Sequence, residues 1–253
     1  MTTSSQGQHF DVLGVSIDAV TTGSTVERIR RLVGEGAGGY IVFCTVSSVL
    51  SARDDPTVMK AIDQATVVTP DGMPLVWLGR SALDAPVDRV YGPDLMVDLI
   101  EATGSEFSHY FFGGRGGVAG EMVARLTARF PELRVAGWHE PATTVRLEDS
   151  AADIERIKGS GADLLWVGLG HPKQELWMQT HIPGDLPCVA LGVGAAFDFH
   201  AGRKREAPRW MKRTGLQWLH RLVQEPRRLW RRYLVGNSRF LWLLATQRSN
   251  KKR

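Results

Sequence analysis

The chain lacks long apolar runs and has few cysteines. Its longest apolar stretches, such as Phe240–Ala245, fall far short of the roughly 20 residues that a membrane-spanning helix needs. Met1 to Gln8 is polar and has no apolar segment, so no secretory signal is predicted. Cys44 and Cys188 both lie in apolar strand-like runs, which favours two buried thiols over a disulfide or redox pair. We therefore expect a cytoplasmic protein that meets a membrane only peripherally.

Acidic residues are scarce in the C-terminal part of the chain. Residues 203–253 hold sixteen Lys or Arg against two Glu, so this segment carries +14, while the first 202 residues sum to −10 and the whole chain to +4. Four of the eight tryptophans lie in the same segment. Cationic side chains interleaved with large amphipathic rings suit an anionic partner. The candidates are a membrane face, a nucleotide diphosphate and a nucleic acid.

Residues 1–202 alternate between apolar strand-like runs and amphipathic helical stretches. Strands are predicted at Val12–Ile17, Tyr40–Cys44, Thr66–Thr69, His109–Phe112, Arg134–Trp138, Asp163–Val167 and Cys188–Val193. Helices are predicted near Thr25–Val33, Thr57–Gln64, Pro74–Arg80, Asp94–Thr103, Val118–Phe130, Ala151–Lys158 and Pro172–Gln179. Continuous hydrophobic strands that alternate with helices indicate a parallel sheet covered on both faces. The sequence therefore predicts an α/β fold with a doubly wound, mostly parallel, Rossmann-like sheet in residues 1–202, followed by a basic, Trp-rich helical appendage in residues 203–253.

Glycine-rich loops follow three of the predicted strands, beginning at Gly113, Gly168 and Gly192. Glycine lets the backbone approach a ligand closely, and a helix N-terminus beside it offers free N–H groups to a phosphate. One such loop is more often plain turn chemistry, but three at the carboxyl edge of one sheet favour a nucleotide site. Lys173 and Phe197 stand where the dinucleotide fingerprint has its third glycine, so a nicotinamide oxidoreductase is disfavoured.

A carboxylate follows another short strand, in the hexapeptide Thr69-Pro70-Asp71-Gly72-Met73-Pro74. Pro70 ends the strand, and the Asp-Gly turn points the carboxylate into the cleft from the start of the next helix. A carboxylate held there can act as a general base. An ordinary turn or cap aspartate explains the hexapeptide equally well, so the hexapeptide alone leaves both interpretations open.

The order of these residues resembles one enzyme family. In the first 202 residues the matching positions are Thr45, Pro70–Pro74, Arg89, Gly92, Asp94, Leu95, Gly170–Glu175, Gly192–Asp198, Ala201 and Gly202. In the basic segment they are Arg205, Ala207, Pro208, Trp210, Gly215, Leu216, Trp218, Leu219, Arg221, Leu222, Glu225–Leu229 and Arg231–Tyr233. The pattern runs from about Phe10 to Phe240 and resembles the WecG/TagA/CpsF glycosyltransferases, family 26.

The resemblance implies transfer of N-acetylmannosamine or a related sugar from a UDP-sugar to a sugar on undecaprenyl diphosphate, with inversion, in teichoic-acid-type or other cell-surface polysaccharide synthesis. It implies that Asp71 is the catalytic base and that Thr45 and Gln174 line the active-site pocket. By motif position, Arg221, Arg228 and Arg231 are expected to bind the donor diphosphate, with Arg89 as a further pocket residue. The other donor-binding residues are expected in the glycine-rich loops and are Gly113, Gly170, Lys173, Gly192 and Gly194. Ser47 and Asp198 are expected in the acceptor or sugar pocket.

Two positions depart from the family pattern. The family usually has Asn two residues after the threonine, whereas this chain has Ser47, and it commonly has Glu where this chain has Gln217. At position 47 a short hydroxyl replaces an amide that both donates and accepts, so a contact to the donor or acceptor sugar is expected to differ. The resemblance therefore specifies the reaction class more firmly than the donor.

The sequence indicates neither a metal nor a cofactor. None of the fifteen aspartates has another two positions away, and the seven histidines form no ligand cluster. Displacement at an anomeric carbon needs a base on the incoming hydroxyl and cations on the departing diphosphate. We therefore predict that arginines neutralise the diphosphate without a metal ion. Arg227 with Arg231, and Arg228 with Arg232, are spaced to share one helical face, although a purely solvated face is the alternative for Arg227 and Arg232.

The appendage is also expected to lie on an anionic membrane surface, where its tryptophans and leucines meet the interface and its cations meet lipid headgroups. A nucleic-acid-binding protein would explain the basic segment but not the cleft or Asp71, so no nucleic-acid partner is predicted. A non-catalytic protein that binds nucleotide sugars stays the main alternative. An exposed apolar patch in the appendage would also allow a homo-oligomer.

Overall fold

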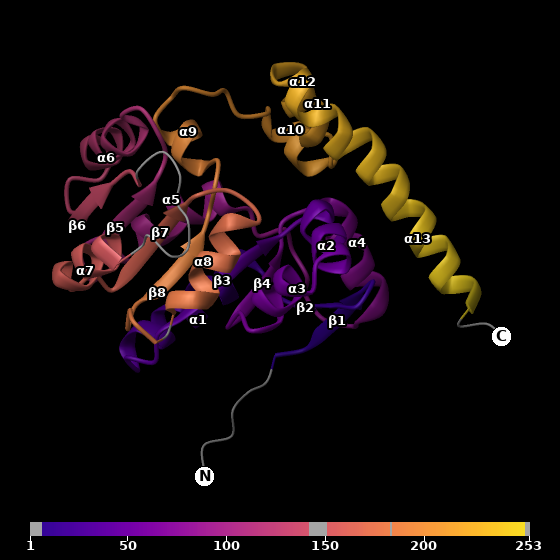
Figure 1. Cartoon of the computed structure of the whole chain (residues 1–253), viewed down its shortest axis with the longest axis horizontal. Coiled ribbons are helices and arrows are strands. Elements are labelled where there is room, and N and C mark those ends of the chain that lie inside the picture. The colour runs from indigo at the N-terminus through magenta and orange to yellow at the C-terminus, as the bar shows by residue number, and fades with distance from the viewer. Residues whose placement is uncertain (1–6, 142–150, 183, 251–253) are drawn as a thin grey trace, which may run out of the picture.

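The computed structural model describes residues 7–141, 151–182 and 184–250, so residues 251–253 of the predicted appendage lie outside it. Its centre is a six-stranded sheet in the order β4-β3-β8-β7-β5-β6 (Figure 1). Every neighbouring pair of strands in it is parallel. The strands are β3 (Gly39–Cys44), β4 (Val67–Pro70), β5 (Ser108–Gly113), β6 (Arg134–His139), β7 (Leu164–Gly168) and β8 (Val189–Gly192). The predicted doubly wound α/β fold is confirmed.

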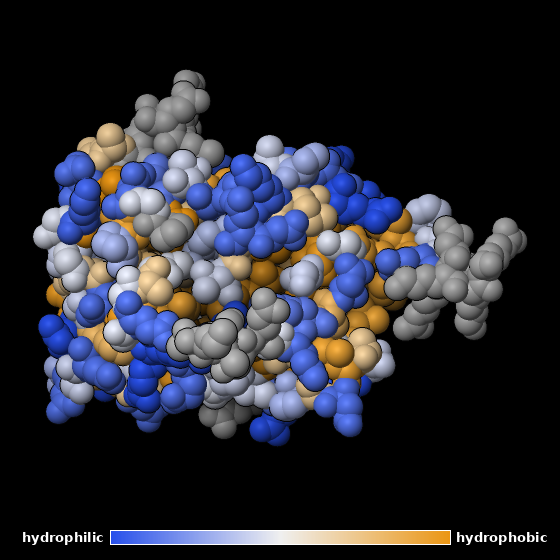
Figure 2. Space-filling model, turned by 90° about the horizontal axis from the view of Figure 1, so that it is seen from below, coloured by the Kyte–Doolittle hydropathy of each residue, from blue (hydrophilic) through white to orange (hydrophobic). Residues whose placement is uncertain are grey.

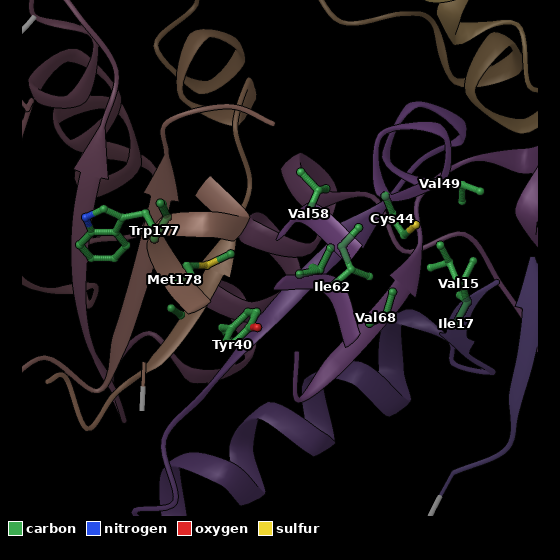
Figure 3. Close-up of a cluster of buried hydrophobic side chains, with 14 of the residues drawn as sticks. Val15, Ile17, Tyr40, Cys44, Val49, Val58, Ile62, Val68, Trp177 and Met178 are labelled. Atoms are coloured by element: carbon green, nitrogen blue, oxygen red, sulfur yellow. The ribbon is translucent and has the colours of Figure 1, made fainter. Parts of the chain in front are cut away.

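Apolar side chains cover both faces of the sheet, which is why the strands appear in the sequence as continuous hydrophobic runs. In β3, Tyr40, Val42 and Cys44 belong to one core cluster, and Ile41 and Phe43 belong to the other. The first cluster includes residues of α2 (Val46–Asp54), α3 (Pro56–Asp63), α4 (Met73–Ala82), α7 (Ala151–Ser160) and α8 (Lys173–His181), and part of it is drawn in Figure 3. The second includes residues of α1 (Thr22–Gly34), α5 (Gly92–Thr103), α6 (Val118–Arg129) and α9 (Ala196–His200).

Both cysteines are free and buried, as the sequence predicts. Cys44 ends a central strand and lies within the first cluster, among the labelled side chains of Figure 3. Burial raises the pKa of both thiols above their ordinary value, to about 12 for Cys188. Neither thiol is therefore ionised near neutral pH, which agrees with packing rather than reactive cysteines.

The prediction of a single strand at Val12–Ile17 is wrong. The chain forms an antiparallel hairpin there, β1 (His9–Val12) and β2 (Val15–Asp18), outside the six-stranded sheet. Two residues with positive φ, Leu13 at 56° and Gly14 at 95°, turn the chain between two apolar stretches that look continuous in the sequence. Asp18 fastens the hairpin to the sheet edge by accepting from the Val68 amide at 2.8 Å.

Helix α2 was not predicted from the sequence. Its first turn reads Val-Ser-Ser, which has no clear amphipathic period, but Thr45 begins it with a capping box. The Ser48 amide donates to Thr45 Oγ1 at 3.2 Å, and the Thr45 amide donates to Ser48 Oγ at 3.1 Å. Thr45 directly follows β3, so the N-terminus of α2 lies at the carboxyl edge of the sheet.

The basic segment is helical and rests on the rest of the chain. It comprises α10 (Arg209–Arg213), α11 (Gln217–Gln224), α12 (Pro226–Trp230), the π-helical turn η2 (Arg231–Val235) and α13 (Gly236–Asn250) (Figure 1). Phe240 and Leu243 of α13 are buried in the same cluster as Leu50 of α2. Arg239 adds a two-pronged ion pair to Asp54, with both distances 2.5 Å. No helix among the described residues has the length and apolar character needed to cross a bilayer.

Candidate active site

Two adjoining cavities lie at the carboxyl ends of the central strands, between the sheet and the basic segment. The larger has a volume of about 520 Å³ and the smaller about 300 Å³. Five residues line both of them, namely Thr45, Asp71, Tyr91, Arg221 and Arg232. A further cavity of about 220 Å³, near Cys188 at the opposite edge of the sheet, contains none of the predicted site residues.

The larger cavity collects most of the predicted donor-binding residues. Those lining it are Gly170, Lys173, Gly192, Gly194, Arg221 and Arg228, together with Gln174 and Asp198. Gly170 has a φ of +81° and open space where a Cβ would lie, so glycine there both permits the turn and leaves the cavity free. Asp198 is paired with Lys204, whose Nζ donates to Asp198 Oδ2 at 2.8 Å.

The glycine-rich loop after β5 reaches the larger cavity through Gly114, but Gly113 itself is placed differently from the prediction. Gly113 does not line either cavity, and a Cβ there would come within 2.6 Å of the Gly168 backbone, so this glycine lets two strand ends pack closely. The N-terminus of α6 beside it is occupied, because the Glu140 carboxylate accepts from the Gly117 amide at 3.0 Å and from the Ala119 amide at 3.1 Å. These amides are therefore satisfied internally, and the expectation of a free helix N-terminus here is wrong.

Gln174 ties the other two glycine-rich loops together. It is buried, its Oε1 accepts from the Gly170 amide at 3.1 Å, and its Nε2 donates to the Gly192 carbonyl at 2.5 Å. A Cβ at position 192 would lie 2.8 Å from Met178 Cε and 3.0 Å from Gln174 Nε2. Glycine at 192 therefore makes room for the glutamine, and Gln174 holds the shape of the cavity floor.

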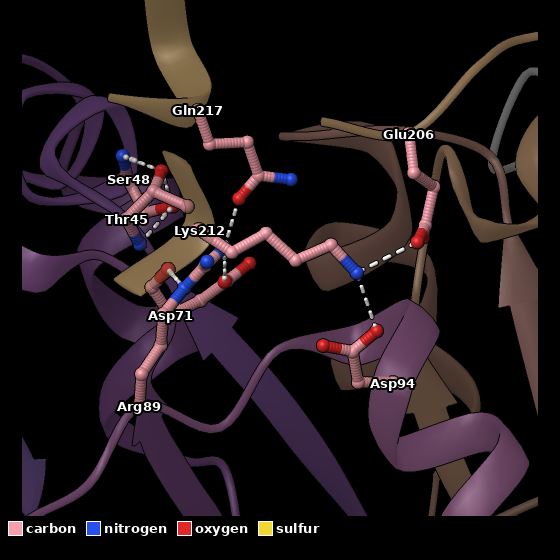
Figure 4. Close-up of polar contacts among 8 residues, drawn as sticks. All are labelled: Thr45, Ser48, Asp71, Arg89, Asp94, Glu206, Lys212 and Gln217. Carbon is pink, nitrogen blue, oxygen red and sulfur yellow. Dashed lines mark hydrogen bonds and ion pairs between the residues drawn. The ribbon is translucent and has the colours of Figure 1, made fainter. Parts of the chain in front are cut away.

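Asp71 follows β4 and lies where the two cavities meet. Its backbone amide donates to the Cys44 carbonyl at 2.8 Å, which fixes the residue beside the end of β3. Arg89 Nη2 donates to Asp71 Oδ1 at 3.1 Å, and Arg89 Nε donates to the Asp71 backbone carbonyl at 2.8 Å (Figure 4). Burial raises the pKa of Asp71 to about 6, although the Arg89 and Arg221 guanidiniums oppose the rise. A carboxylate with that pKa is mostly ionised at pH 7 yet still basic enough to accept a proton.

The arginines of the basic segment converge on the cavities from α11 to η2. Arg221 and Arg232 line both cavities, and Arg228 lines the larger one while pairing with Glu225. Burial together with the charges of Arg221 and Arg228 lowers the pKa of Arg232, and Arg232 Nε has no hydrogen-bond partner among the described residues. Several guanidiniums held this close repel one another, so a bound anion would stabilise the arrangement.

Arg231 and Arg232 lie differently with respect to the cavities. The sequence predicts Arg231 at the donor, but Arg231 is exposed, lines neither cavity and lies over the Trp230 ring at 5.3 Å. Arg232, for which the sequence leaves a solvated face as the alternative, lines both cavities. The π-helical turn that begins at Arg231 alters the angular spacing of the side chains, which a helical period of 3.6 residues does not anticipate.

The smaller cavity is more apolar than the larger one. Its apolar lining is Val46, Met73, Pro74, Trp77, Leu216, Trp218 and Tyr233, with Ser47 and Gln217 among its polar residues. Arg89 also lines this cavity and not the larger one, with its guanidinium 4.4 Å from the centre of the Tyr91 ring. Ser47 is thus placed on the side away from the glycine-rich loops.

Comparison with known proteins adds the family. A family model described as the glycosyl transferase WecG/TagA/CpsF family matches residues 10–253. The chain belongs to this family. This glycosyltransferase is 27% identical over 219 residues to the N-acetylglucosaminyldiphosphoundecaprenol N-acetyl-beta-D-mannosaminyltransferase of Bacillus spizizenii strain W23, which covers 86% of this chain and 83% of the relative. The protein of the same name from Bacillus subtilis strain 168 is 23% identical over 223 residues, 88% of this chain and 85% of the relative.

Two residues of the candidate site were not assigned from the sequence. Tyr91 lines both cavities beside Asp71, and Gln217 accepts a hydrogen bond from Arg89 across the boundary between the basic segment and the rest of the chain. The only sequence signal for either was the motif around Arg89 and the departure noted at position 217. Within the described parts of the chain, no group of three or more His, Cys, Asp or Glu is placed to hold a metal ion.

Proposed function

We propose that this glycosyltransferase moves a sugar from a UDP-sugar to a sugar carried on a polyprenyl diphosphate, with inversion and without a metal ion, in the synthesis of a cell-surface polymer. The observation that carries the proposal is the position of Asp71. It is a buried carboxylate with a pKa raised to about 6, at the junction of a cationic cavity and an apolar one. The names of the two relatives supply the acceptor type and the sugar, N-acetylmannosamine, as the first candidates.

The larger cavity suits the donor. Arg221, Arg228 and Arg232 present guanidiniums on one side, and the loops at Gly170 and Gly192 provide close backbone approach on the other. Guanidinium forks bind phosphate oxygens through charge-assisted hydrogen bonds and neutralise the charge that develops as a diphosphate departs. This supports arginines in the role that a divalent ion has in many nucleotide-sugar enzymes.

The smaller cavity suits the acceptor. Its sugar hydroxyl would enter between Thr45 and Asp71, while Trp77 and Trp218 offer apolar contact to the first part of a polyprenyl chain. In a single displacement, the hydroxyl oxygen bonds to the anomeric carbon as the bond from that carbon to the diphosphate oxygen breaks. The hydroxyl proton passes to Asp71, and the electron pair leaves with UDP.

The basic segment also supports contact with an anionic membrane. Several large apolar side chains of α12, η2 and α13 are exposed, namely Trp230, Leu234, Val235, Leu241 and Trp242. On the face shown in Figure 2, apolar surface gathers in the right half of the view, the side on which Figure 1 shows α13. Exposed apolar rings next to cations are typical of peripheral membrane contact, and they would bring the smaller cavity to a lipid-linked acceptor.

A screen of UDP-sugars tests the proposal directly. The purified protein is incubated with each UDP-sugar and a short-chain polyprenyl-diphosphate N-acetylglucosamine, and the glycolipid product is identified by mass and anomeric configuration. Transfer from UDP-N-acetylmannosamine with a β product supports the proposal. Tight UDP-sugar binding with neither transfer nor hydrolysis would favour the alternative, a non-catalytic protein that binds nucleotide sugars.

A further inference from the structure

A single guanidinium joins the basic segment to Asp71. Arg89 Nη2 donates to Asp71 Oδ1 at 3.1 Å and also donates to Gln217 Oε1, the first residue of α11. Figure 4 shows the side chains of Gln217, Arg89 and Asp71 meeting end to end. Asp71 and Arg89 belong to loops at the sheet edge, whereas Gln217 belongs to the segment that covers them. The contact therefore crosses between two parts of the chain that are far apart in sequence.

The contact has little freedom to move. Gln217 is 8% exposed, and the side chains of Arg89 and Asp71 are 16% and 14% exposed. Arg89 Nε donates to the Asp71 backbone carbonyl, and Arg89 Nη2 donates both to the Asp71 carboxylate and to the Gln217 amide oxygen. Because the Gln217 amide is neutral, it orients Arg89 without taking up its charge, and that charge stays available to the Asp71 carboxylate.

We propose that Gln217 is a positioning residue for the base. It holds Arg89 against Asp71 only while α11 lies on the core, so the alignment of the Asp71 carboxylate depends on the docked basic segment. The proposal rests on the proposed function of Asp71. It goes beyond that function by naming the residue through which a remote segment acts on the reacting site. Gln217 itself need not touch either substrate for this role.

Two other charged side chains also act on Asp71, and one of them, Arg221, lies one helical turn after Gln217 in α11. Arg221 from α11 favours the ionised carboxylate, while Asp94 from α5 disfavours it. Asp94 is itself paired with Lys212, at 2.8 Å, in a contact visible in Figure 4. Cys44 and Tyr91 also sense Asp71, but burial raises the pKa of both groups well beyond neutrality, so neither exchanges protons in the same range.

The decisive variant is Gln217→Glu, which keeps the size of the side chain and places a negative charge next to Arg89 Nη2. The new carboxylate would bind Arg89 and disfavour ionisation of Asp71. The acidic limb of the profile of kcat/KM against pH should therefore move upward by about one pH unit, the shift typical of a like charge nearby. Gln224→Glu is the matched control, because it adds the same charge to the exposed end of the same helix and should leave the limb in place.

Several outcomes would overturn the idea. The first is a folded Gln217→Glu enzyme whose acidic limb of kcat/KM against pH stays at the wild-type position. The second is a Gln224→Glu control whose acidic limb moves by the same amount as that of Gln217→Glu. If the charged variant proves unstable, Gln217→Met decides, since it removes the acceptor without adding charge. We expect about a tenfold fall in kcat with the donor KM retained, because the base is misaligned and the donor cavity is intact. Wild-type kcat in Gln217→Met would refute the positioning role.

The proposed function and this coupling can fail separately. If the wild-type protein transfers no sugar, the function fails, and the coupling is then measured by the pH dependence of unfolding. A higher pKa of Asp71 in Gln217→Glu extends to higher pH the range over which stability falls as pH rises. If the unfolding free energy of Gln217→Glu follows that of wild type over the whole pH range, the coupling is rejected, whether or not the protein transfers sugar.

Discussion

Asp71→Asn should make the protein more stable at neutral pH while removing most of its activity. The folded-state pKa of Asp71 is about 6, against an ordinary value of 3.8, because burial outweighs the attraction of Arg89 and Arg221. Between about pH 4 and pH 6 the unfolded chain has lost the proton and the folded chain still holds it. Stability is therefore lost as pH rises through this window, and the loss is complete above pH 6.

The expected size follows from the difference between the two pKa values, about two pH units, which corresponds to about 3 kcal/mol. Asparagine carries no charge, so it escapes this loss, and its oxygen can still accept a hydrogen bond from Arg89. The difference in unfolding free energy, variant minus wild type, should therefore grow by up to about 3 kcal/mol between pH 4 and pH 6 and then level off. Turnover should fall by about 10²–10⁴-fold, the usual effect of losing a general base.

Denaturant unfolding at a series of pH values, paired with sugar transfer at pH 7.5, checks both parts. Asp54→Asn is a suitable control, because the hydrogen bond from Arg239 lowers the pKa of Asp54 and so gives the opposite sign. Because both side chains of that pair are about half exposed, Asp54→Asn should lose only a small amount of stability, and only above the unfolded pKa of Asp54. A flat difference for Asp71→Asn from pH 4 to pH 7 would refute the raised pKa, and undiminished turnover would remove Asp71 from the reaction.

Three further outcomes follow from the site. Arg232→Gln should weaken UDP-sugar binding by about 10-fold or more in calorimetry, because a buried charge-assisted contact is lost. Arg227→Gln should change UDP-sugar binding little. If Arg231→Gln weakens binding more than Arg232→Gln does, the placement of Arg232 at the donor is wrong. Saturating chelator should leave transfer unchanged, and strict loss restored by manganese would end the metal-free proposal. Replacing Leu241 and Trp242 by Ser should reduce binding to anionic vesicles by about tenfold in sedimentation, because exposed apolar side chains lose their burial in the interface, and unaltered binding would exclude α13 from the contact.

The strands and most helices were predictable because their signals are local. Runs such as Tyr40–Cys44 are apolar at every position, which is what a strand buried on both faces requires. The hairpin at His9–Asp18 escaped prediction because its turn uses Leu13, a residue without the usual turn chemistry. Helix α2 escaped because a capping box at Thr45, and not an amphipathic period, begins it.

The site was predictable where the family pattern or a strand end marks a residue. Asp71, Thr45 and Arg221 lie around one junction, although they belong to three separate parts of the sequence. Gly113 was assigned to the donor because glycines after strands look alike, and only the close approach of Gly168 shows what this one accommodates. Arg232 faces the cavities because it lies in a π-helical turn, and a helical period of 3.6 residues in the sequence does not predict such a turn.

The sequence by itself determined the alternation of strands and helices, the separation of an acidic body from a basic end and the candidacy of Asp71, because each of these depends on residues close together in the chain. Tertiary structure alone decided the chemistry of Asp71, since its pKa depends on burial and on two arginines, one 18 and the other 150 positions away. It likewise decided that Gln217 meets Arg89 across a separation of 128 residues. Distances through space set electrostatic energies, and the order of residues along the chain does not contain them.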